Sequence, residues 1–172
     1  MERVARFEKV SEEQFIRDFK SSFGEKVPEE EIRRMYEAVR LPARATSGSA
    51  GYDFFSPLHL SLRPGESVRI PTGIRASVQN GWVLLLMPRS SLGFKFRIQL
   101  SNTVGVIDSD YYGSDNEGHI LIKLINAGRE GLTADIPEGK AFAQGLFVPF
   151  GITEDDACEG ERHGGLGSTD EA

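Results

Sequence analysis

The chain has 172 residues, of which 39% are hydrophobic and 27% charged, a composition that is ordinary for one water-soluble globular domain. Its formal net charge of −6 argues against non-specific binding to nucleic acid, yet local arginines and backbone amides can still bind a small anion. No apolar run approaches the roughly 20 residues that span a membrane, and residues 1–6 lack the apolar core of a signal peptide, so we expect a cytoplasmic protein.

The first forty residues have the pattern of two short helices. Ser11 followed by Gln14 resembles a capping box, and apolar residues then recur at helical spacing as far as Gly24. Pro28 suits the first position of a second helix. The apolar stripe of this second helix consists of Ile32, Met35, Tyr36 and Val39. Two such helices cannot bury their stripes alone, so we expect residues 1–40 to form a helical extension that packs on the main body or on a protein partner.

From residue 41 onward, short apolar stretches alternate with Gly and Pro turn signals, which indicates β-strands. The expected strands cover residues 67–78, 82–87, 119–125 and 141–150. This spacing is typical of a sandwich or barrel, so we predict an all-β fold with a β domain over residues 41–152. Residues 153–172, which are acidic and then glycine-rich, are predicted to form a flexible tail.

Residues 105–113, with the sequence Gly-Val-Ile-Asp-Ser-Asp-Tyr-Tyr-Gly, place two carboxylates and two aromatic rings at the end of an apolar run. Val106 and Ile107 indicate the end of a strand, and residues 108–113 indicate a turn. Such a turn holds an acid beside a flat ring within reach of a ligand, which suits an enzyme that acts on water and a small substrate. The alternative is an ordinary hairpin, since Asp and Gly are common turn residues.

Residues 87–93 carry donors that suit phosphate groups. Pro88 ends the preceding strand, and the side chains and backbone amides that follow it can grip phosphate oxygens. The side-chain donors are Arg89, Ser90 and Ser91. The alternative is a polar turn with a solvated arginine.

Residues 162–169, with the sequence Arg-His-Gly-Gly-Leu-Gly-Ser-Thr, resemble a phosphate-binding loop, because glycines allow close approach of the backbone. Arg162, Ser168 and Thr169 supply donors. The segment is not a Walker A motif, since no lysine precedes Ser168. The alternative is a Gly-Ser tail that binds nothing.

Two weaker segments add one polar side chain each. Residues 49–53 form a turn into a strand that carries Asp53. Residues 139–144 form a turn and a strand that carry Gln144. Neither segment indicates a function when it is considered alone.

Together, the order, spacing and spelling of the five segments resemble the trimeric dUTPase family. The flanking residues 41–46 and 71–74 agree, and the resemblance extends over residues 41–170. It implies a β jelly roll that assembles as a homotrimer, with active sites shared between neighbouring subunits. It also implies hydrolysis of dUTP to dUMP and pyrophosphate, with Mg²⁺ held by the triphosphate and by water rather than directly by the protein. Such an enzyme removes dUTP from the nucleotide pool and supplies dUMP for dTMP synthesis.

The resemblance assigns roles to individual residues. Asp108 matches the catalytic acid that orients and deprotonates the water attacking the α-phosphorus, and Gln144 helps to position water or phosphate. Tyr111 matches the ring that packs on deoxyribose and leaves no space for a 2′-hydroxyl group, while Asp53 supports the site. The uracil edge would be read by Asn102 and by the backbone of Gly105, Val106 and Ile107. The phosphates would be held by Arg89, Ser90 and Ser91 and by a C-terminal lid that contains Arg162, Gly167, Ser168 and Thr169.

Two segments depart from the family pattern. Ala141 stands where the fourth segment usually has Arg, and Lys140 lies directly before it. Leu166 stands where the family has the phenylalanine that caps uracil. Leucine covers a base but does not stack on it, so Phe94 or Phe96 is a candidate for that place.

Two alternatives remain within this resemblance. Residues 116–120 resemble dCTP deaminase, but the glutamate on which deamination depends would fall at Lys123, which cannot act as that base. The second alternative is a dUTPase-like protein whose N-terminal helices bind a protein partner. More simply, these helices cover the outside of the trimer or an open sheet edge.

A structural metal site and a disulfide framework are not expected. The single cysteine, Cys158, excludes an internal disulfide bond. The histidines at positions 59, 119 and 163 do not have zinc-ligand spacing, and we expect them at the surface or in turns.

Overall fold

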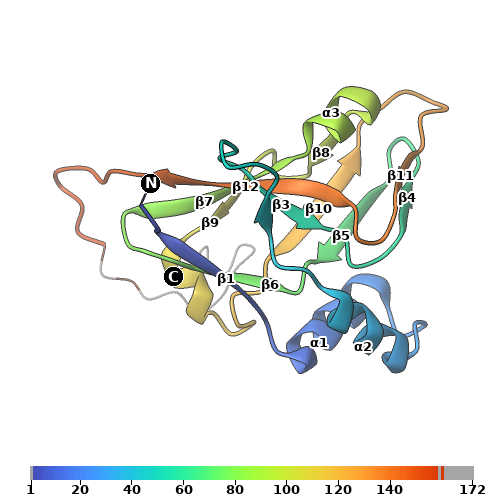
Figure 1. The fold of residues 1–172 in the computed structure, drawn as a ribbon, viewed down its shortest axis with the longest axis horizontal. Coiled ribbons are helices and arrows are strands. Elements are labelled where there is room, and N and C mark those ends of the chain that lie inside the picture. Colours follow the sequence, from blue (N-terminus) through green and yellow to red (C-terminus); the bar gives the residue numbers. More distant parts are fainter. Residues whose placement is uncertain (1, 159, 161–172) are drawn as a thin grey trace.

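The computed structural model describes residues 2–158 and residue 160. Its largest sheet has five antiparallel strands in the order β2-β3-β12-β7-β9 (Figure 1). The bounds are Ala43–Arg44 for β2, Tyr52–Phe55 for β3, Ala141–Pro149 for β12, Trp82–Pro88 for β7 and Gly105–Ile107 for β9. β12 is the central strand, since it pairs with β3 on one side and with β7 on the other.

Smaller antiparallel sheets complete the β structure of the described residues. One contains β5 (Ser67–Pro71), β10 (Leu121–Asn126) and β8 (Ile98–Leu100), the next β4 (Leu60–Leu62) and β11 (Ala134–Ile136), and the last β1 (Ala5–Lys9) and β6 (Ile74–Val78). The expected single strand over residues 67–78 is wrong, because Gly73 has φ of 73° and turns the chain between β5 and β6. The predicted all-β class with a jelly-roll-like arrangement is confirmed.

Both predicted N-terminal helices are present. α1 spans Glu12–Phe23, and Ser11 caps it by accepting a hydrogen bond from the backbone N–H of Gln14 (3.1 Å). α2 spans Glu29–Ala38 and begins directly after Pro28. Two further short helices occur where we expected turns, namely α3 (Ser90–Phe96) and the 3₁₀ helix η1 (Ser109–Gly113).

Strand β1 was not predicted, and its presence means that the N-terminal region is not helical alone. β1 pairs with β6, so the chain first joins a sheet and only then forms α1 and α2. The apolar stripes of both helices are buried in the main core, where Phe15 and Ile32 are each 0% exposed. Figure 1 shows the two helices together at one side of the body, beside β5 and β6. The helices therefore pack on the body, and the structure gives no support to a protein partner that binds them. The division of the chain into a helical extension, a β domain and a tail at residues 40 and 152 stays a prediction.

Candidate active site

Five of the predicted site residues line one open cavity of about 550 Å³. Asp53 on β3 lies opposite Gln144 on β12 in the sheet register. Arg89 directly follows β7, and Ser90 and Ser91 begin α3. Strand pairing thus brings together three segments that lie far apart in the sequence.

Asp53 and Arg89 form an ion pair within this cavity. The Asp53 side chain is 15% exposed and that of Arg89 is 34% exposed. A guanidinium group has five N–H donors, so Arg89 retains donors for an anion while Asp53 fixes its orientation. With the hydroxyl groups of Ser90 and Ser91 beside it, this cavity is chemically suited to phosphate oxygens.

A second, smaller pocket of about 90 Å³ contains the remaining described residues of the predicted base and sugar site. The predicted residues that line it are Asn102, Gly105, Val106, Ile107 and Tyr111. β9 is one of the two edge strands of the large sheet, and among the described strands it pairs with β7 alone. An edge strand presents backbone N–H and C=O groups on its outer side, as recognition of a base edge requires. Lys123 lines the same pocket, so a lysine and not a glutamate occupies this position.

Asp108 and Tyr111 are placed by the start of η1. Asp108 is the N-cap residue of this helix, and its backbone oxygen accepts a hydrogen bond from the backbone N–H of Tyr111 (3.3 Å). The Asp108 side chain is half-buried, and Asp108 follows Ile107 directly without lining the pocket itself. Tyr111 is 7% exposed, and its hydroxyl group donates to the backbone oxygen of His119 (2.8 Å).

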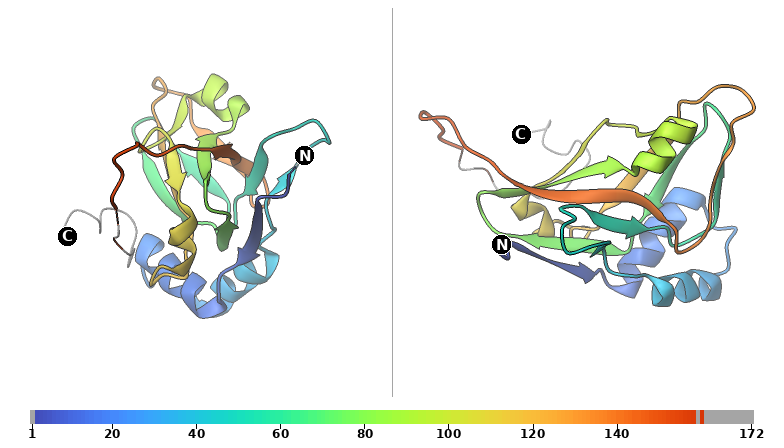
Figure 2. Two further views of the ribbon diagram at one scale, coloured as in Figure 1. Left: turned by 90° about the vertical axis from the view of Figure 1, so that its left-hand side faces the viewer. Right: turned by 45° about the horizontal axis from the view of Figure 1, so that its top comes forward.

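Within one chain, Asp108 and Arg89 lie toward opposite ends of β7. Ile107 pairs with Leu84, and Arg89 lies five positions further along the chain, which corresponds to roughly 17 Å along a strand. Figure 2 agrees, since α3 and the gold segment that contains η1 lie apart in both views. Asp108 and Arg89 of the same chain therefore do not meet.

The structure also reveals contacts that the sequence did not indicate, made by the loop of residues 114–119 that follows η1. Asn116 Nδ2 donates to the Tyr111 hydroxyl oxygen (2.8 Å). Glu117 accepts hydrogen bonds from the backbone N–H (2.8 Å) and the hydroxyl group (2.6 Å) of Ser11. We expected His119 at the surface or in a turn; its backbone N–H closes a turn by donating to the Asn116 backbone oxygen (3.0 Å), but its side chain is completely buried against α1 and not at the surface. The sequence showed only which residues stand at positions 116–119. Their contacts with α1 and its N-cap residue join positions about a hundred residues apart, so the local pattern could not predict them.

We expect acidification to weaken the contact between Glu117 and Ser11. Burial raises the pKa of the Glu117 carboxyl, but the hydrogen bonds from Ser11 and the nearby charges of Arg75 and Arg17 together outweigh it and leave this pKa lowered from 4.5. A carboxylate with a lowered pKa stabilises the fold above its unfolded-state value, and this contribution is lost as the pH falls through the folded-state value. In Glu117→Gln, the free energy of unfolding by urea should therefore fall less between about pH 6 and pH 3.5 than in the parent chain. Equal falls in both chains would contradict this expectation.

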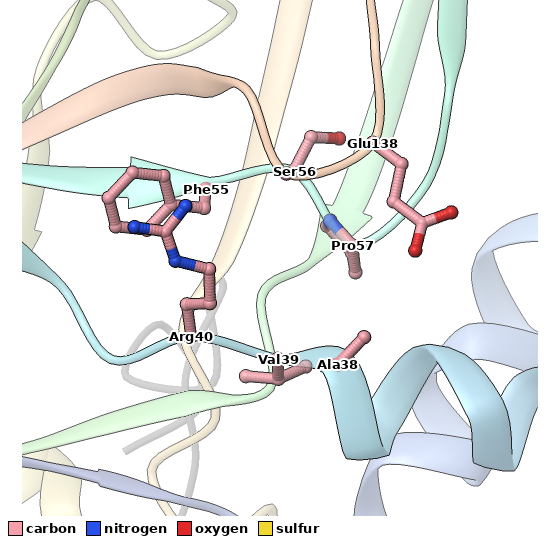
Figure 3. Close-up of a pocket in the computed structure, with 8 residues that line it drawn as sticks. Ala38, Val39, Arg40, Phe55, Ser56, Pro57 and Glu138 are labelled. Atoms are coloured by element: carbon pink, nitrogen blue, oxygen red, sulfur yellow. The ribbon is translucent and has the colours of Figure 1, made fainter.

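A third cavity, of about 220 Å³, lies beside the C-terminal end of α2 (Figure 3). The Arg40 guanidinium group lies over the Phe55 ring, 3.9 Å from its centre. Glu138 binds Arg34 (3.1 Å), and the Ser56 hydroxyl group donates to the backbone of Leu58 (2.7 Å). None of the predicted site residues that the structure describes lines this cavity, and its polar side chains already have partners, so it is a packing feature of α2 rather than a candidate active site.

Some predicted residues lie outside the part of the chain that the structure describes. These are Arg162, Leu166, Gly167, Ser168 and Thr169, and the expected lid stays a prediction. Of the two rings considered as a cap for uracil, Phe96 packs against the core, whereas Phe94 is 92% exposed. Phe94 is thus the one that is free to contact a neighbouring molecule.

Within the described residues, no three His, Cys, Asp or Glu side chains gather as a set of metal ligands. Over the same residues, none of the helices combines the length and the apolar character of a membrane span.

Comparison with known proteins agrees with this geometry. A family model described as dUTPase matches residues 37–169. The deoxyuridine 5′-triphosphate nucleotidohydrolase of Lactococcus lactis is 42% identical over 134 residues, which covers 76% of this chain and 88% of that protein. The Escherichia coli K12 protein of the same name is 38% identical over 142 residues and covers 78% and 89%.

Solved structures show the same likeness. The crystal structure of the dUTPase from Streptococcus mutans is 40% identical, has a TM-score of 0.59 and covers 66% of this chain and 88% of that chain. The dUTPase from phage phi11 of S. aureus is 28% identical, with a TM-score of 0.59 and coverage of 72% and 92%.

Proposed function

Because the chain belongs to the dUTPase family, we propose that it hydrolyses dUTP to dUMP and pyrophosphate, which removes dUTP from the nucleotide pool and supplies dUMP. The observation that carries the proposal is that one chain has two pockets of complementary chemistry. One offers an edge strand and a buried tyrosine beside Asp108, as a base and sugar require. The other offers Arg89 and two serines, as a triphosphate requires.

The separation of Asp108 and Arg89 supports active sites that are shared between subunits, as in the homotrimer that the family resemblance implies. Arg89 and Asp108 are separated by roughly 17 Å along β7 within one chain, so these two residues of one chain do not converge on the same phosphorus atom. A second subunit that places its edge strand β9 beside the cavity of the first brings base pocket and phosphate cavity together. Closed symmetric assembly repeats this contact at every interface.

Recognition of the nucleoside rests on the smaller pocket. Asn102 and the backbone of residues 105–107 bind the uracil edge, since a fixed backbone N–H donates to a carbonyl oxygen of uracil but has no acceptor for the amino group of cytosine. Tyr111 packs against the deoxyribose and leaves no room for a 2′-hydroxyl group. Its buried ring, held at the hydroxyl group by His119 and Asn116, suits a rigid steric wall.

Asp108 acts as the base in this proposal. Its carboxylate accepts a proton from the water that attacks the α-phosphorus, the bond from that phosphorus to the bridging oxygen breaks, and pyrophosphate leaves. Phosphoryl transfer depends mainly on positioning and on neutralisation of charge. Arg89, Ser90, Ser91 and Gln144 supply these contacts from the neighbouring subunit, and Asp53 orients Arg89. The tail of residues 162–169 completes the phosphate contacts as a lid.

The oxygen-rich surroundings of the proposed triphosphate site are compatible with Mg²⁺. The cavity offers hydroxyl, amide and carboxylate oxygens, and Asp53 is already paired with Arg89. Mg²⁺ prefers oxygen ligands, keeps several waters and binds readily to phosphates. We propose that triphosphate oxygens and waters hold it, without a direct protein ligand, and that it neutralises phosphate charge.

The proposal is tested by supplying dUTP, dCTP, dTTP and UTP separately and measuring pyrophosphate, ammonia and nucleoside monophosphate. We expect pyrophosphate and dUMP from dUTP, at a rate well above that with the other nucleotides. Ammonia from dCTP would identify a deaminase instead, and no product from any nucleotide would contradict hydrolysis.

Replacing Tyr111 by alanine is expected to lower the preference for dUTP over UTP by about 10-fold or more, because the wall against the 2′-hydroxyl group is removed. The measurement is the ratio of kcat/KM for the two nucleotides. An unchanged ratio in a folded variant would contradict the steric role of Tyr111.

A further inference from the structure

The loop of residues 114–119 holds the hydroxyl end of Tyr111. The Tyr111 hydroxyl group donates to the backbone oxygen of His119 (2.8 Å) and accepts a hydrogen bond from Asn116 Nδ2 (2.8 Å). Both partners belong to this one loop, and Asn116 also bonds to the His119 backbone oxygen (3.3 Å). The position of the ring in the smaller pocket therefore depends on the conformation of the loop.

This loop has a backbone conformation that needs support. Glu117 has φ of 59° and Gly118 has φ of 69°, and a left-handed conformation costs a non-glycine residue about 1–2 kcal/mol. A Cβ atom on Gly118 would lie 2.7 Å from the Tyr111 backbone oxygen, so the loop is pressed closely against η1. The Glu117 carboxylate receives two hydrogen bonds from Ser11, the N-cap residue of α1, which offset the cost of this conformation.

A second connection joins the same loop to α1 through a buried histidine. The backbone N–H of Gly73 donates to His119 Nε2 (2.8 Å), so the ring proton lies on Nδ1. Nδ1 donates to Asp18 Oδ2 on α1 (2.5 Å), and Gln14 Nε2 donates to the same oxygen (2.8 Å). The ring of His119 is thereby fixed from both sides, and its backbone oxygen is the one that Tyr111 binds.

We propose that α1 is a brace for sugar recognition, in which Ser11 and Asp18 act through Glu117 and His119 as positioning residues for Tyr111. The inference rests on the proposed role of Tyr111. The brace gives α1 a role in substrate selection beyond its burial in the core. It holds the Tyr111 ring where a 2′-hydroxyl group would collide with it.

The test compares kcat/KM for dUTP and UTP in variants of the full chain. Asp18→Ala and Glu117→Ala are each expected to lower the dUTP/UTP ratio by about 3- to 10-fold, because a small displacement of a positioned group changes discrimination strongly. Asp18→Asn keeps an oxygen that accepts from His119 Nδ1, so its ratio should stay within about 2-fold of the parent.

Glu138→Ala is the matched control. It removes a carboxylate that joins α2, and not α1, to the body through Arg34 (3.1 Å). Its ratio should equal that of the parent even if its melting temperature falls. If Asp18→Ala does not fold, Ser11→Ala, which removes one hydrogen bond to Glu117, should still lower the ratio by about 2-fold or more.

Equal losses of kcat/KM for dUTP and UTP in Asp18→Ala and Glu117→Ala would overturn the brace and leave a purely structural role. In a Tyr111→Ala background, adding Glu117→Ala should change the ratio no further, since both act on one wall. If Tyr111→Ala lowers the ratio but the α1 variants do not, only the brace fails. If Tyr111→Ala itself has no effect, the proposed role of Tyr111 fails first.

Discussion

Asp108→Asn is expected to lower kcat by about 10²–10⁴-fold or more, because an amide cannot accept the proton of the attacking water. Asparagine keeps the shape of the side chain at the N-cap of η1, so the fold and dUTP binding should persist. The measurements are the steady-state rate with dUTP and the affinity for dUTP by calorimetry. Turnover within 10-fold of the parent would exclude Asp108 as the base.

Mixed assemblies extend this test to the shared site. Asp108→Asn and Arg89→Ala should each be nearly inactive as pure proteins, because one lacks the base and the other a phosphate contact. If the two residues of one site come from different subunits, refolding equal amounts together restores up to about a quarter of the parent activity. No recovery in mixtures that contain both subunits would contradict sharing between the two pockets.

Phe15→Ala is expected to destabilise the protein by about 3–5 kcal/mol, the cost of removing a large buried ring. Phe15 is 0% exposed and packs against Phe19, Tyr36 and His119, so the cavity would open where α1 meets the body. The measurement is the free energy of unfolding by urea. A change below 1 kcal/mol would mean that α1 is a dispensable attachment.

Phe23→Ala provides the comparison within the same helix. Phe23 is the last residue of α1 and is only partly buried, and the centre of its ring lies 4.8 Å from the centre of the Phe19 ring. Its replacement should cost about 1–2 kcal/mol, since less apolar surface leaves water. Equal costs at both positions would contradict the burial gradient along α1.

The local sequence was sufficient for the features that depend on neighbouring residues. Apolar residues at helical spacing, such as Phe15 and Phe19 in α1 and Ile32 in α2, predicted two amphipathic helices. Ser11 predicted the start of α1 correctly. The apolar run that ends at Pro88 predicted β7. These features follow from periodicity and capping, which act over a few residues.

Other features were misjudged because they depend on partners far along the chain. β1 carries a mixed pattern, and it is a strand because β6, about seventy residues later, supplies its hydrogen bonds. His119 resembled a surface residue, yet the amide of Gly73 and the carboxylate of Asp18 satisfy its ring and allow complete burial. Neither partner can be inferred from the residues around it.

The sequence by itself determined which chemical groups this protein carries: an acid and a ring in residues 105–113, and an arginine with two serines in residues 87–93. Only the tertiary structure decided how these groups are distributed. The register of β7 with β9 places Arg89 and Asp108 toward opposite ends of β7, and the contacts of α1 with residues 114–119 hold the loop that binds the Tyr111 hydroxyl group. The physical reason is that register and burial arise from contacts between distant segments, which the local pattern does not encode.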